Sequence, residues 1–481
     1  MLKSKFLLFC LSLLICISAC KDKKTVTPEI VVPPTPPTSQ KSDVECWLTN
    51  ADQSALFQQQ NVSLFFKSEQ NNNSTIVVDT STTYQTIDGF GYTLTDGSAS
   101  LMNALSADKK SAILEQLFAT DKTNIGVSYL RISIGASDLS ASPYTFNDMP
   151  TGQTDVNLEN FNMDKAMQDL VPILKKIIAI YPDIKILGSP WTAPAWMKTN
   201  NSFVGGSLKP EYYQVYANYL VKFIKAMKQE GIVIDAITPQ NEPLHGGNNP
   251  SMVMQASEQA SFIKNALGPI FKQEGLNTKI IIWDHNADRP EYPLEILNDP
   301  EARPYVNGSA FHLYGGSISA LSQVRDAYPD KGIYFTEQWI GGPGNFAGDL
   351  KWHIETLIIG ATRNWSRNVL EWNLAADENY QPHTDGGCST CLGAITVNST
   401  VKKNTAYYII AHASKFVRPG SVRIASNQMT DLPNVAFKTP DGKKVLIVLN
   451  KSGINQNFNI KFKDKAVSTS LKVGSVATYV W

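Results

Sequence analysis

The 481-residue sequence carries little charge and no excess of either sign. Lysine and arginine together number 43, and so do aspartate and glutamate, which makes the formal net charge zero. A protein that binds nucleic acid normally has a basic excess that neutralises phosphates, so no nucleic-acid partner is expected. Hydrophobic residues make up 43% of the chain, which is typical of a globular protein and argues against a disordered one.

The N-terminus has no apolar run of membrane-spanning length, because the run over residues 6–17 is short. A spanning helix needs about 20 apolar residues, whereas a short run after Lys3 and Lys5 is typical of a signal peptide. Small residues precede Cys20 as in a bacterial lipobox, in which the cysteine becomes the lipidated first residue of the mature chain. We therefore expect residues 1–20 to be a lipoprotein signal peptide, with an ordinary secretory signal as the alternative.

A proline-rich segment follows the expected lipidation site. Residues 21–43 have a charged start and contain five prolines, a composition that stays extended and does not pack a core. The segment is expected to be a tether. Together these features predict an exported bacterial lipoprotein that a lipid anchor holds to a membrane, at the outer membrane or cell surface or on the periplasmic face. A monomer is expected.

Cysteine is scarce beyond the signal peptide, where only Cys46, Cys388 and Cys391 remain. Cys388 and Cys391 have the C-x-x-C spacing, which occurs in redox sites and in half of a zinc site. No second pair completes a zinc site, and an exported protein meets oxidising conditions, so a local disulfide is expected. The sequence displays no other cluster of metal ligands. Neither a metal nor a cofactor is therefore expected.

Residues 85–400 have the pattern of a parallel α/β fold. Short apolar runs alternate with stretches of helical periodicity, which is typical of β/α units. Eight units over about 300 residues match the size of a (β/α)8 TIM barrel, and this is the expected catalytic domain. The eight expected strands lie near residues 87–92, 128–134, 184–189, 233–238, 279–283, 308–313, 332–336 and 368–372.

Strand-like patterns flank the barrel on both sides. Residues 44–84 and 401–481 contain short apolar runs separated by turn-forming residues. Neither segment is large enough to stand alone, so we expect the N-terminal strands and the C-terminal segment to build one side β-sandwich together.

The strongest chemical pattern is Asn241-Glu242, which directly follows the fourth expected strand. The C-terminal ends of barrel strands line the active site of this fold. A carboxyl group there is placed to protonate a leaving oxygen while the Asn241 amide holds a sugar hydroxyl. The alternative is structural, because Asn-Glu-Pro also suits the first turn of a helix.

A second carboxylate, Glu337, follows the seventh expected strand. Cleavage of a glycosidic bond uses two carboxyl groups that flank the anomeric carbon, and strand ends four and seven face one another across a barrel. A surface carboxylate is the alternative for Glu337 alone. Paired with Glu242, it favours a glycosidase.

Further candidates end neighbouring strands. The indole rings of Trp191 and Trp372 suit stacking on sugar rings, although packing tryptophans are the alternative. Arg131 lies inside an apolar strand, where it needs an anionic partner, and Glu337 is the obvious one. His312 and Tyr314 end the sixth strand and are candidates for substrate binding, while His312 also suits a core position with its hydrogen bonds satisfied.

These motifs resemble glycoside hydrolase family 30, the glucosylceramidase-like family, from about residue 76 to the C-terminus. The resemblance implies a (β/α)8 barrel with a side β-sandwich and a retaining mechanism, with Glu242 as acid/base and Glu337 as nucleophile. It also implies that Asp96, Trp191, Asn241 and Trp372 contact the sugar. The motifs that carry it are Gly89-Phe90-Gly91, Leu94-Thr95-Asp96, Arg131-Ile132-Ser133-Ile134-Gly135, Ser189-Pro190-Trp191, Asn241-Glu242-Pro243, Thr336-Glu337 and Trp372-Asn373-Leu374-Ala375.

The loop after the eighth strand indicates a subgroup. Residues 381–391, which include Cys388 and Cys391, are similar to the loop of the family's endo-β-1,6-glucanases, and Leu313 stands where the glucosylceramidases have tryptophan. We therefore expect cleavage of a β-linked glucan, most closely an endo-β-1,6-glucanase. The alternatives are a glucosylceramidase, a β-xylosidase or a xylanase of the same family, and more distantly a non-catalytic surface glycan-binding lipoprotein.

The expected mechanism is a two-step displacement. An ionised Glu337, held by Arg131, attacks the anomeric carbon. Glu242 is expected to have a raised pKa, so that it gives a proton to the leaving oxygen and then acts as a base on water.

Overall fold

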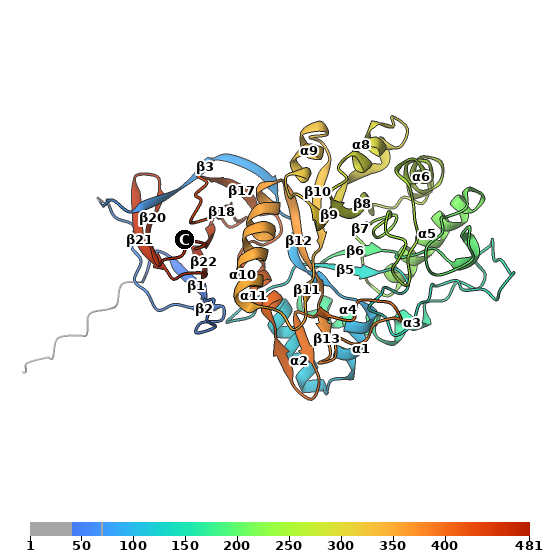
Figure 1. Ribbon diagram of the computed structural model, residues 1–481, viewed down its shortest axis with the longest axis horizontal. Coiled ribbons are helices and arrows are strands. Elements are labelled where there is room, and N and C mark those ends of the chain that lie inside the picture. The colour runs from blue at the N-terminus through green and yellow to red at the C-terminus, as the bar shows by residue number, and fades with distance from the viewer. Residues whose placement is uncertain (1–40, 69–70) are drawn as a thin grey trace, which may run out of the picture. The chain divides into compact units, whose positions relative to one another are not determined.

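The computed structural model describes residues 41–68 and 71–481 (Figure 1). The expected signal peptide with Cys20, and nearly all of the expected tether, lie outside the described residues, so the lipoprotein assignment stays a prediction. Among the described residues, no helix is both long and apolar enough to cross a membrane.

Eight parallel strands close into a barrel, which confirms the expected fold class (Figure 1). Each of the eight expected strands is present, although β7 has only two residues. Strand β12 pairs with β4 and closes the ring. The barrel strands are β4 (Gly89–Thr93), β5 (Tyr129–Ser133), β6 (Lys185–Ser189), β7 (Ala236–Ile237), β8 (Lys279–Ala287), β9 (Val306–Gly316), β10 (Gly332–Glu337) and β12 (Ser366–Asn373).

Seven of the barrel strands each contribute one side chain to a separate buried cluster. Side chains alternate in direction along a strand, so each strand sends every second residue inward and the barrel interior is filled rather than hollow. Strand β4 contributes none, because a Cβ at Gly91 would lie 1.9 Å from the carbonyl oxygen of Tyr129. The cluster consists of Tyr129, Leu187, Ala236, Ile281, Ala310, Tyr334 and Leu370.

Helices alternate with the strands along the chain. Helix α2 illustrates the pattern, because Ile113, Leu114, Leu117 and Phe118 form one buried face at helical spacing. The helices are α1 (Asp96–Ala104), α2 (Ala107–Phe118), α3 (Asp164–Gln168), α4 (Leu170–Ile180), α5 (Tyr213–Gln229), α6 (Ala256–Phe262), α7 (Gly268–Gln273), α8 (Glu291–Asn298), α9 (Ala320–Ala327), α10 (Phe346–His353) and α11 (Thr405–Ser414).

A nine-stranded sheet takes strands from both ends of the chain, as expected, and forms the side sandwich. N-terminal β1 pairs with C-terminal β22, and β3 pairs with both β17 and β20. Its strands are β1 (Glu45–Thr49), β2 (Gln58–Gln59), β3 (Ser74–Thr86), β17 (Val422–Ser426), β18 (Asn434–Lys438), β19 (Lys444–Leu449), β20 (Gln456–Phe462), β21 (Lys465–Leu471) and β22 (Val476–Val480).

Strand β19 explains why sandwich and barrel pack together. Val445, Ile447 and Leu449 belong to the same core cluster as the barrel helices, whereas Leu446 and Val448 belong to the sandwich's own cluster. Alternate residues of a strand face opposite sides, so this uninterrupted apolar run is buried on both faces.

Residues 405–414, which we assigned to the sandwich, instead form helix α11. All ten of its residues are buried, so the helix has no polar face and no amphipathic period. The hydroxyl of Tyr92 on barrel strand β4 donates a hydrogen bond to the carbonyl oxygen of Ala406. Helix α11 therefore packs on the barrel, and the C-terminal strands of the large sheet begin at Val422.

Candidate active site

Irregular strand ends direct charged side chains toward one place on the barrel. The register of β8 against β9 shifts between Trp283 and His285, and that of β10 against β9 shifts between Phe335 and Glu337. Asp284 has φ +65°, and Glu242, after β7, has φ +43°. Bulges re-aim side chains, and left-handed backbone at non-glycine residues is characteristic of functional sites.

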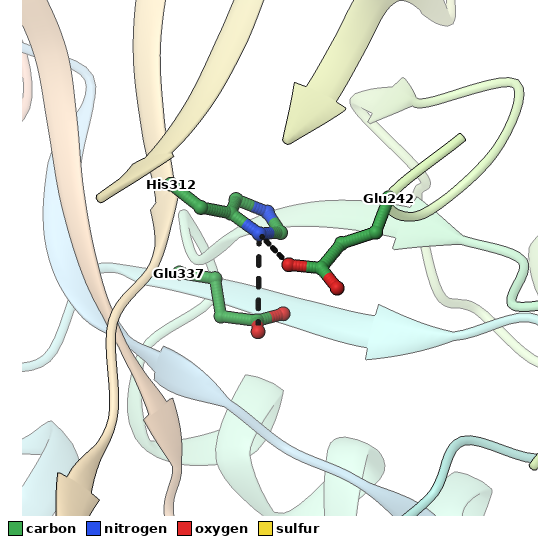
Figure 2. Close-up of side chains that lie close together, drawn as sticks. All are labelled: Glu242, His312 and Glu337. Atoms are coloured by element: carbon green, nitrogen blue, oxygen red, sulfur yellow. Dashed lines mark hydrogen bonds and ion pairs between the residues drawn. The ribbon is translucent and has the colours of Figure 1, made fainter. Parts of the chain in front are cut away.

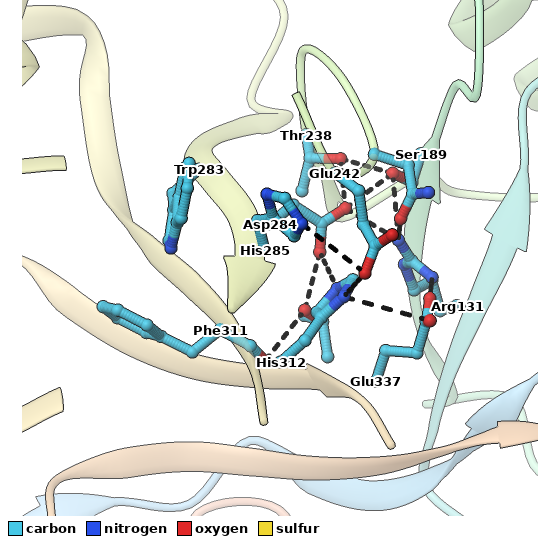
Figure 3. Close-up of polar contacts among 12 residues, drawn as sticks. Arg131, Ser189, Thr238, Glu242, Trp283, Asp284, His285, Phe311, His312 and Glu337 are labelled. Carbon is cyan, nitrogen blue, oxygen red and sulfur yellow. Dashed lines mark hydrogen bonds and ion pairs between the residues drawn. The ribbon is translucent and has the colours of Figure 1, made fainter. Parts of the chain in front are cut away.

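Arg131 on β5 is fully buried and lies beside these side chains (Figure 3). Its guanidinium donates to Glu337 at 2.6 Å, to Asp284 at 2.8 Å and to the side-chain oxygen of Asn241 at 2.6 Å. Its Cζ atom lies 4.7 Å from the ring centre of Trp191. The predicted pair of Arg131 with Glu337 is therefore present, and Arg131 also joins a second carboxylate.

Asp284 is that second carboxylate, and the sequence analysis missed it. One oxygen accepts from Arg131, from Ser189 at 2.7 Å and from Thr238 at 2.8 Å (Figure 3). The other contacts His312 at 3.1 Å. Although burial opposes ionisation, the charge of Arg131 and these hydrogen bonds hold the pKa of Asp284 well below its usual range.

His312 lies between the two predicted catalytic glutamates (Figure 2). Its Nδ1 is 3.0 Å from Oε1 of Glu242 and 3.9 Å from Oε1 of Glu337. A carboxylate oxygen of each glutamate and a ring nitrogen of His312 all lie within 4.8 Å of one another. The hydroxyl of Tyr314 donates to Glu337 at 2.9 Å. The structure thus brings Glu242 and Glu337 together as the sequence predicted.

These contacts shift the pKa values of His312, Glu242 and Glu337. Burial lowers the pKa of His312, but the charge of Glu337 and the hydrogen bonds to Asp284 and Glu242 outweigh it and raise this pKa to about 9. Burial raises the pKa of Glu242, but the hydrogen bond and charge of His312 lower it overall. Burial is the largest cause that raises the pKa of Glu337. The pKa of Glu242 therefore shifts opposite to the expected direction, because the hydrogen bond and charge of His312 outweigh burial.

A cavity of about 320 Å³ opens at the glutamates. Of the predicted site residues, Glu242, Glu337, Tyr314 and Trp372 line it. Asn241, Arg131 and His312 are buried among the groups that hold the glutamates. The other lining residues are Asp138, His245, Asn248, His285, Asn286, Trp339, Cys388 and Cys391.

Asp96 and Trp191 are not among the residues that line this cavity. Trp191 is buried and stacks on Trp372, with ring centres 5.4 Å apart, so it supports the cavity wall from behind. Asp96 lines a different cavity of about 560 Å³ and accepts hydrogen bonds from Ser140 and Tyr144. The sugar contact of Asp96 stays a prediction, because Asp96 lines a neighbouring cavity and not the one that contains the glutamates.

Asp138 is the third carboxylate of the glutamates' cavity, and the sequence analysis missed it as well. It is only 5% exposed, and the amide N–H of Cys388 donates to its Oδ2 at 3.3 Å. Burial and the charge of Glu337 raise its pKa to about 7. The one available clue was its place shortly after the second strand, at the end of the barrel that holds the site.

The predicted disulfide between Cys388 and Cys391 is present, with Cα atoms 5.7 Å apart. Cys46 is a buried free cysteine in β1, and burial raises its pKa to about 12.

A closed parallel barrel whose strand ends bring two carboxyl groups to one open cavity, with an arginine and a histidine on them, defines a glycoside hydrolase. The chain belongs to glycoside hydrolase family 30. The model of the Glycosyl hydrolase family 30 TIM-barrel domain matches residues 87–417, and that of the family 30 beta sandwich domain matches residues 420–479.

Relatives of two kinds are similar to the chain. The endo-1,6-beta-D-glucanase of Neurospora crassa is 35% identical over 82% of this chain and 85% of its own length. The putative glucosylceramidase 4 of Caenorhabditis elegans is 30% identical over 81% and 79%. The solved structure of the endo-beta1,6-glucanase BT3312 is 36% identical and superimposes with a TM-score of 0.86, covering 92% of this chain and 99% of that one.

Proposed function

We propose that this glycoside hydrolase cleaves β-1,6-glucan internally and retains the configuration of the anomeric carbon. The separation of the two carboxyl groups carries the stereochemical part, because one oxygen of each lies within 4.8 Å of the other. Retaining glycosidases hold these groups about 5–5.5 Å apart, whereas inverting ones leave about 6.5–9.5 Å for a water molecule.

The relatives support the linkage. Identity to the Neurospora crassa endo-1,6-beta-D-glucanase is 35%, against 30% for the nematode putative glucosylceramidase. The disulfide loop also forms part of the cavity wall, where a loop influences which sugar chain fits.

Glu337 is the proposed nucleophile. Arg131 and Tyr314 each donate a hydrogen bond to one of its oxygens, so the carboxylate is fixed in orientation and its charge is compensated. One of these oxygens forms a bond to the anomeric carbon while the glycosidic C–O bond breaks and its electron pair stays on the leaving oxygen.

Glu242 and His312 together supply the proton. The proton on His312 lies on a 3.0 Å hydrogen bond to Glu242, so transfer along this bond gives a neutral carboxyl group that protonates the leaving oxygen. Once Glu337 is esterified, its charge is gone, and this charge is the largest of the causes that raise the pKa of His312. The ionised Glu242 then removes a proton from the attacking water, and hydrolysis of the ester restores Glu337.

Two polar groups are proposed to bind the sugar. The oxygen of the Asn241 side chain accepts from Arg131, which leaves its NH₂ group to donate to the 2-hydroxyl. Asp138 forms a hydrogen bond with another hydroxyl, as acceptor or as donor, and Trp372 offers an aromatic face to the cavity.

Product analysis tests this proposal. A soluble form starting near residue 41 is incubated separately with linear β-1,6-glucan, β-1,3-glucan, xylan and glucosylceramide. We expect short gluco-oligosaccharides from the β-1,6-glucan alone, and proton NMR of the first products should detect the β-anomer before mutarotation. Glucose as the sole early product would reject internal cleavage, and activity on another substrate alone would reject the linkage. An initial α-anomer would reject retention.

We also propose that the enzyme is a monomeric lipoprotein that Cys20 anchors to a membrane. The lipobox and the proline-rich tether support this, because a tether of this kind lets a folded domain reach a polymeric substrate. In cells, the wild-type chain should fractionate with membranes, and Cys20→Ala should release it. Release of the wild type, or membrane retention of the variant, would contradict the anchor. Light scattering of the soluble form tests the monomer.

A further inference from the structure

The Cys388–Cys391 disulfide belongs to the wall of the glutamates' cavity. Both cysteines line that cavity together with Trp339 and Trp372. The same residues form one apolar cluster with Leu139 and Trp191. The four-residue turn that the disulfide closes, residues 388–391, is called the disulfide turn below. It lines the cavity that a bound sugar would occupy, although the chemistry proposed above does not use it.

Cys388, at the start of the disulfide turn, and the residues just before it contact the segment that carries Asp138. The N–H of Thr384 donates to the carbonyl oxygen of Asp138 at 2.9 Å, and the N–H of Cys388 donates to its carboxylate at 3.3 Å. The chains approach so closely that a Cβ at Gly387 would lie 2.4 Å from the Asp138 carbonyl oxygen. Among the described residues, Cys388 is the only other residue that donates a hydrogen bond to the Asp138 carboxylate.

The other end of the disulfide turn is fixed to the barrel loop that follows Glu337. Strand β14 (Cys391–Leu392) pairs antiparallel with β11 (Ile340–Gly341). The N–H of Gly342 donates to the carbonyl oxygen of Thr390 at 2.7 Å. Cys391 is therefore held by β-pairing, whereas the Cys388 amide depends on the disulfide for a fixed distance from that strand.

We propose that the disulfide positions Asp138 for sugar binding, by holding the Cys388 amide against its carboxylate and closing the cavity wall beside it. The ligand is the glucosyl unit that occupies the cavity, so this inference rests on the proposed function. Opening the disulfide releases Cys388 from strand β14, so that only residues 384–387 still hold its amide near Asp138. Asp138 then loses the fixed position of the one hydrogen bond that another described residue donates to its carboxylate, while it remains buried beside two glutamates. Sugar affinity falls, whereas the groups that perform the bond cleavage stay in place.

A double-mutant cycle between the disulfide and Asp138 tests this. The Cys388→Ser/Cys391→Ser variant should raise KM about tenfold, the effect of losing a hydrogen bond to a charged group, with kcat nearly unchanged. Asp138→Ala should also raise KM. The combined variant should have no higher KM than Asp138→Ala alone, because the effects of substitutions that act through one contact do not add. Ser389→Ala is the matched control, since this side chain is exposed within the same turn and should leave KM unchanged.

Reduction of the folded wild type provides a second route that needs no mutant to fold. Dithiothreitol converts the disulfide into two thiols and is itself oxidised to its cyclic disulfide. KM should rise as in the double-serine variant, and reduction should have no effect on Asp138→Ala. Additive effects of the two changes, or a lower melting temperature with unchanged KM, would overturn the positioning role.

A readout without turnover separates this inference from the proposed function. Calorimetry with 1-deoxynojirimycin, a glucose-shaped base, measures occupation of the cavity in every variant. The Kd should rise about tenfold in the double-serine variant and should obey the same non-additive cycle. If β-1,6-glucan is not a substrate but this cycle holds, only the linkage is rejected. If the glucan is cleaved but the two changes act independently, only the positioning role is rejected.

Discussion

Glu337→Ala is expected to lower kcat on β-1,6-glucan by on the order of 10⁴-fold or more, since loss of a catalytic nucleophile removes the covalent route altogether. The side chain accepts hydrogen bonds from Arg131 and Tyr314, and its removal leaves a space beside the anomeric carbon. The melting temperature is recorded alongside, because Arg131 keeps Asp284 as its partner and the fold should persist.

Glu242→Ala is the matched comparison that distinguishes nucleophile from acid/base. Its turnover of the glucan should fall by about 10²–10⁴-fold. An aryl β-gentiobioside with a dinitrophenyl leaving group should still form the glycosyl-enzyme, because this leaving group departs without being protonated. Added azide should then yield a β-glycosyl azide from Glu242→Ala, because azide attacks the covalent intermediate. From Glu337→Ala it should yield an α-glycosyl azide, because azide itself replaces the missing nucleophile.

The azide products test which glutamate is the nucleophile and which is the acid/base. An α-azide from Glu242→Ala with a β-azide from Glu337→Ala would exchange the two roles. Turnover of the glucan by Glu337→Ala at the wild-type rate would reject the site.

The barrel was predictable because its signal is repeated eight times along the chain. Buried parallel strands are short, continuous apolar runs, and each lies between stretches of helical period, so the sequence places all eight. Glu242 and Glu337 followed from the same rule, since both directly follow such runs. Helix α11 was missed for the opposite reason: it is buried on every side, so its sequence has no polar face to reveal the helical period.

Asp96 and Asp138 line different cavities, and the sequence does not distinguish them. Both follow early barrel strands and both are acidic, so position in the sequence did not separate them. Asp96 begins α1 and contacts Ser140 and Tyr144, whereas the chain after β5 brings Asp138 to the glutamates' cavity. Which cavity each carboxylate lines depends on how the loops pack, and the sequence does not encode this in any local pattern.

Asp284 was hidden by an irregularity of the backbone. It follows Trp283 within what looks like a regular apolar strand. In a regular strand the alternation of side chains would point Asp284 out of the barrel. The shift in register between Trp283 and His285, with φ +74° and +65° at Trp283 and Asp284, lets the carboxylate reach both Arg131 and His312. A bulge of this kind leaves no signature in composition or period.

Asp284→Asn is expected to reduce kcat/KM by at least about 100-fold and to lower the free energy of unfolding by about 3 kcal/mol, as when one partner of a buried ion pair is lost. Both carboxylate oxygens accept hydrogen bonds, so an amide must turn an NH₂ group either toward Arg131 or toward His312. Asp235→Asn is the control, since Asp235 likewise forms an ion pair on the barrel, with Lys185, but is partly exposed. This substitution should lower the free energy of unfolding by about 1 kcal/mol or less.

The pH profile of Asp284→Asn separates an effect on the proton from a general loss of stability. In the wild type, Glu337, Asp284 and Glu242 together raise the pKa of His312 to about 9, so His312 stays protonated through neutral pH. Without the charge of Asp284 this pKa falls, and the alkaline limb of kcat/KM should move to lower pH. A variant that loses stability while keeping the wild-type alkaline limb would mean that Asp284 only supports Arg131. A shifted limb would place Asp284, through His312, in control of the proton that Glu242 delivers.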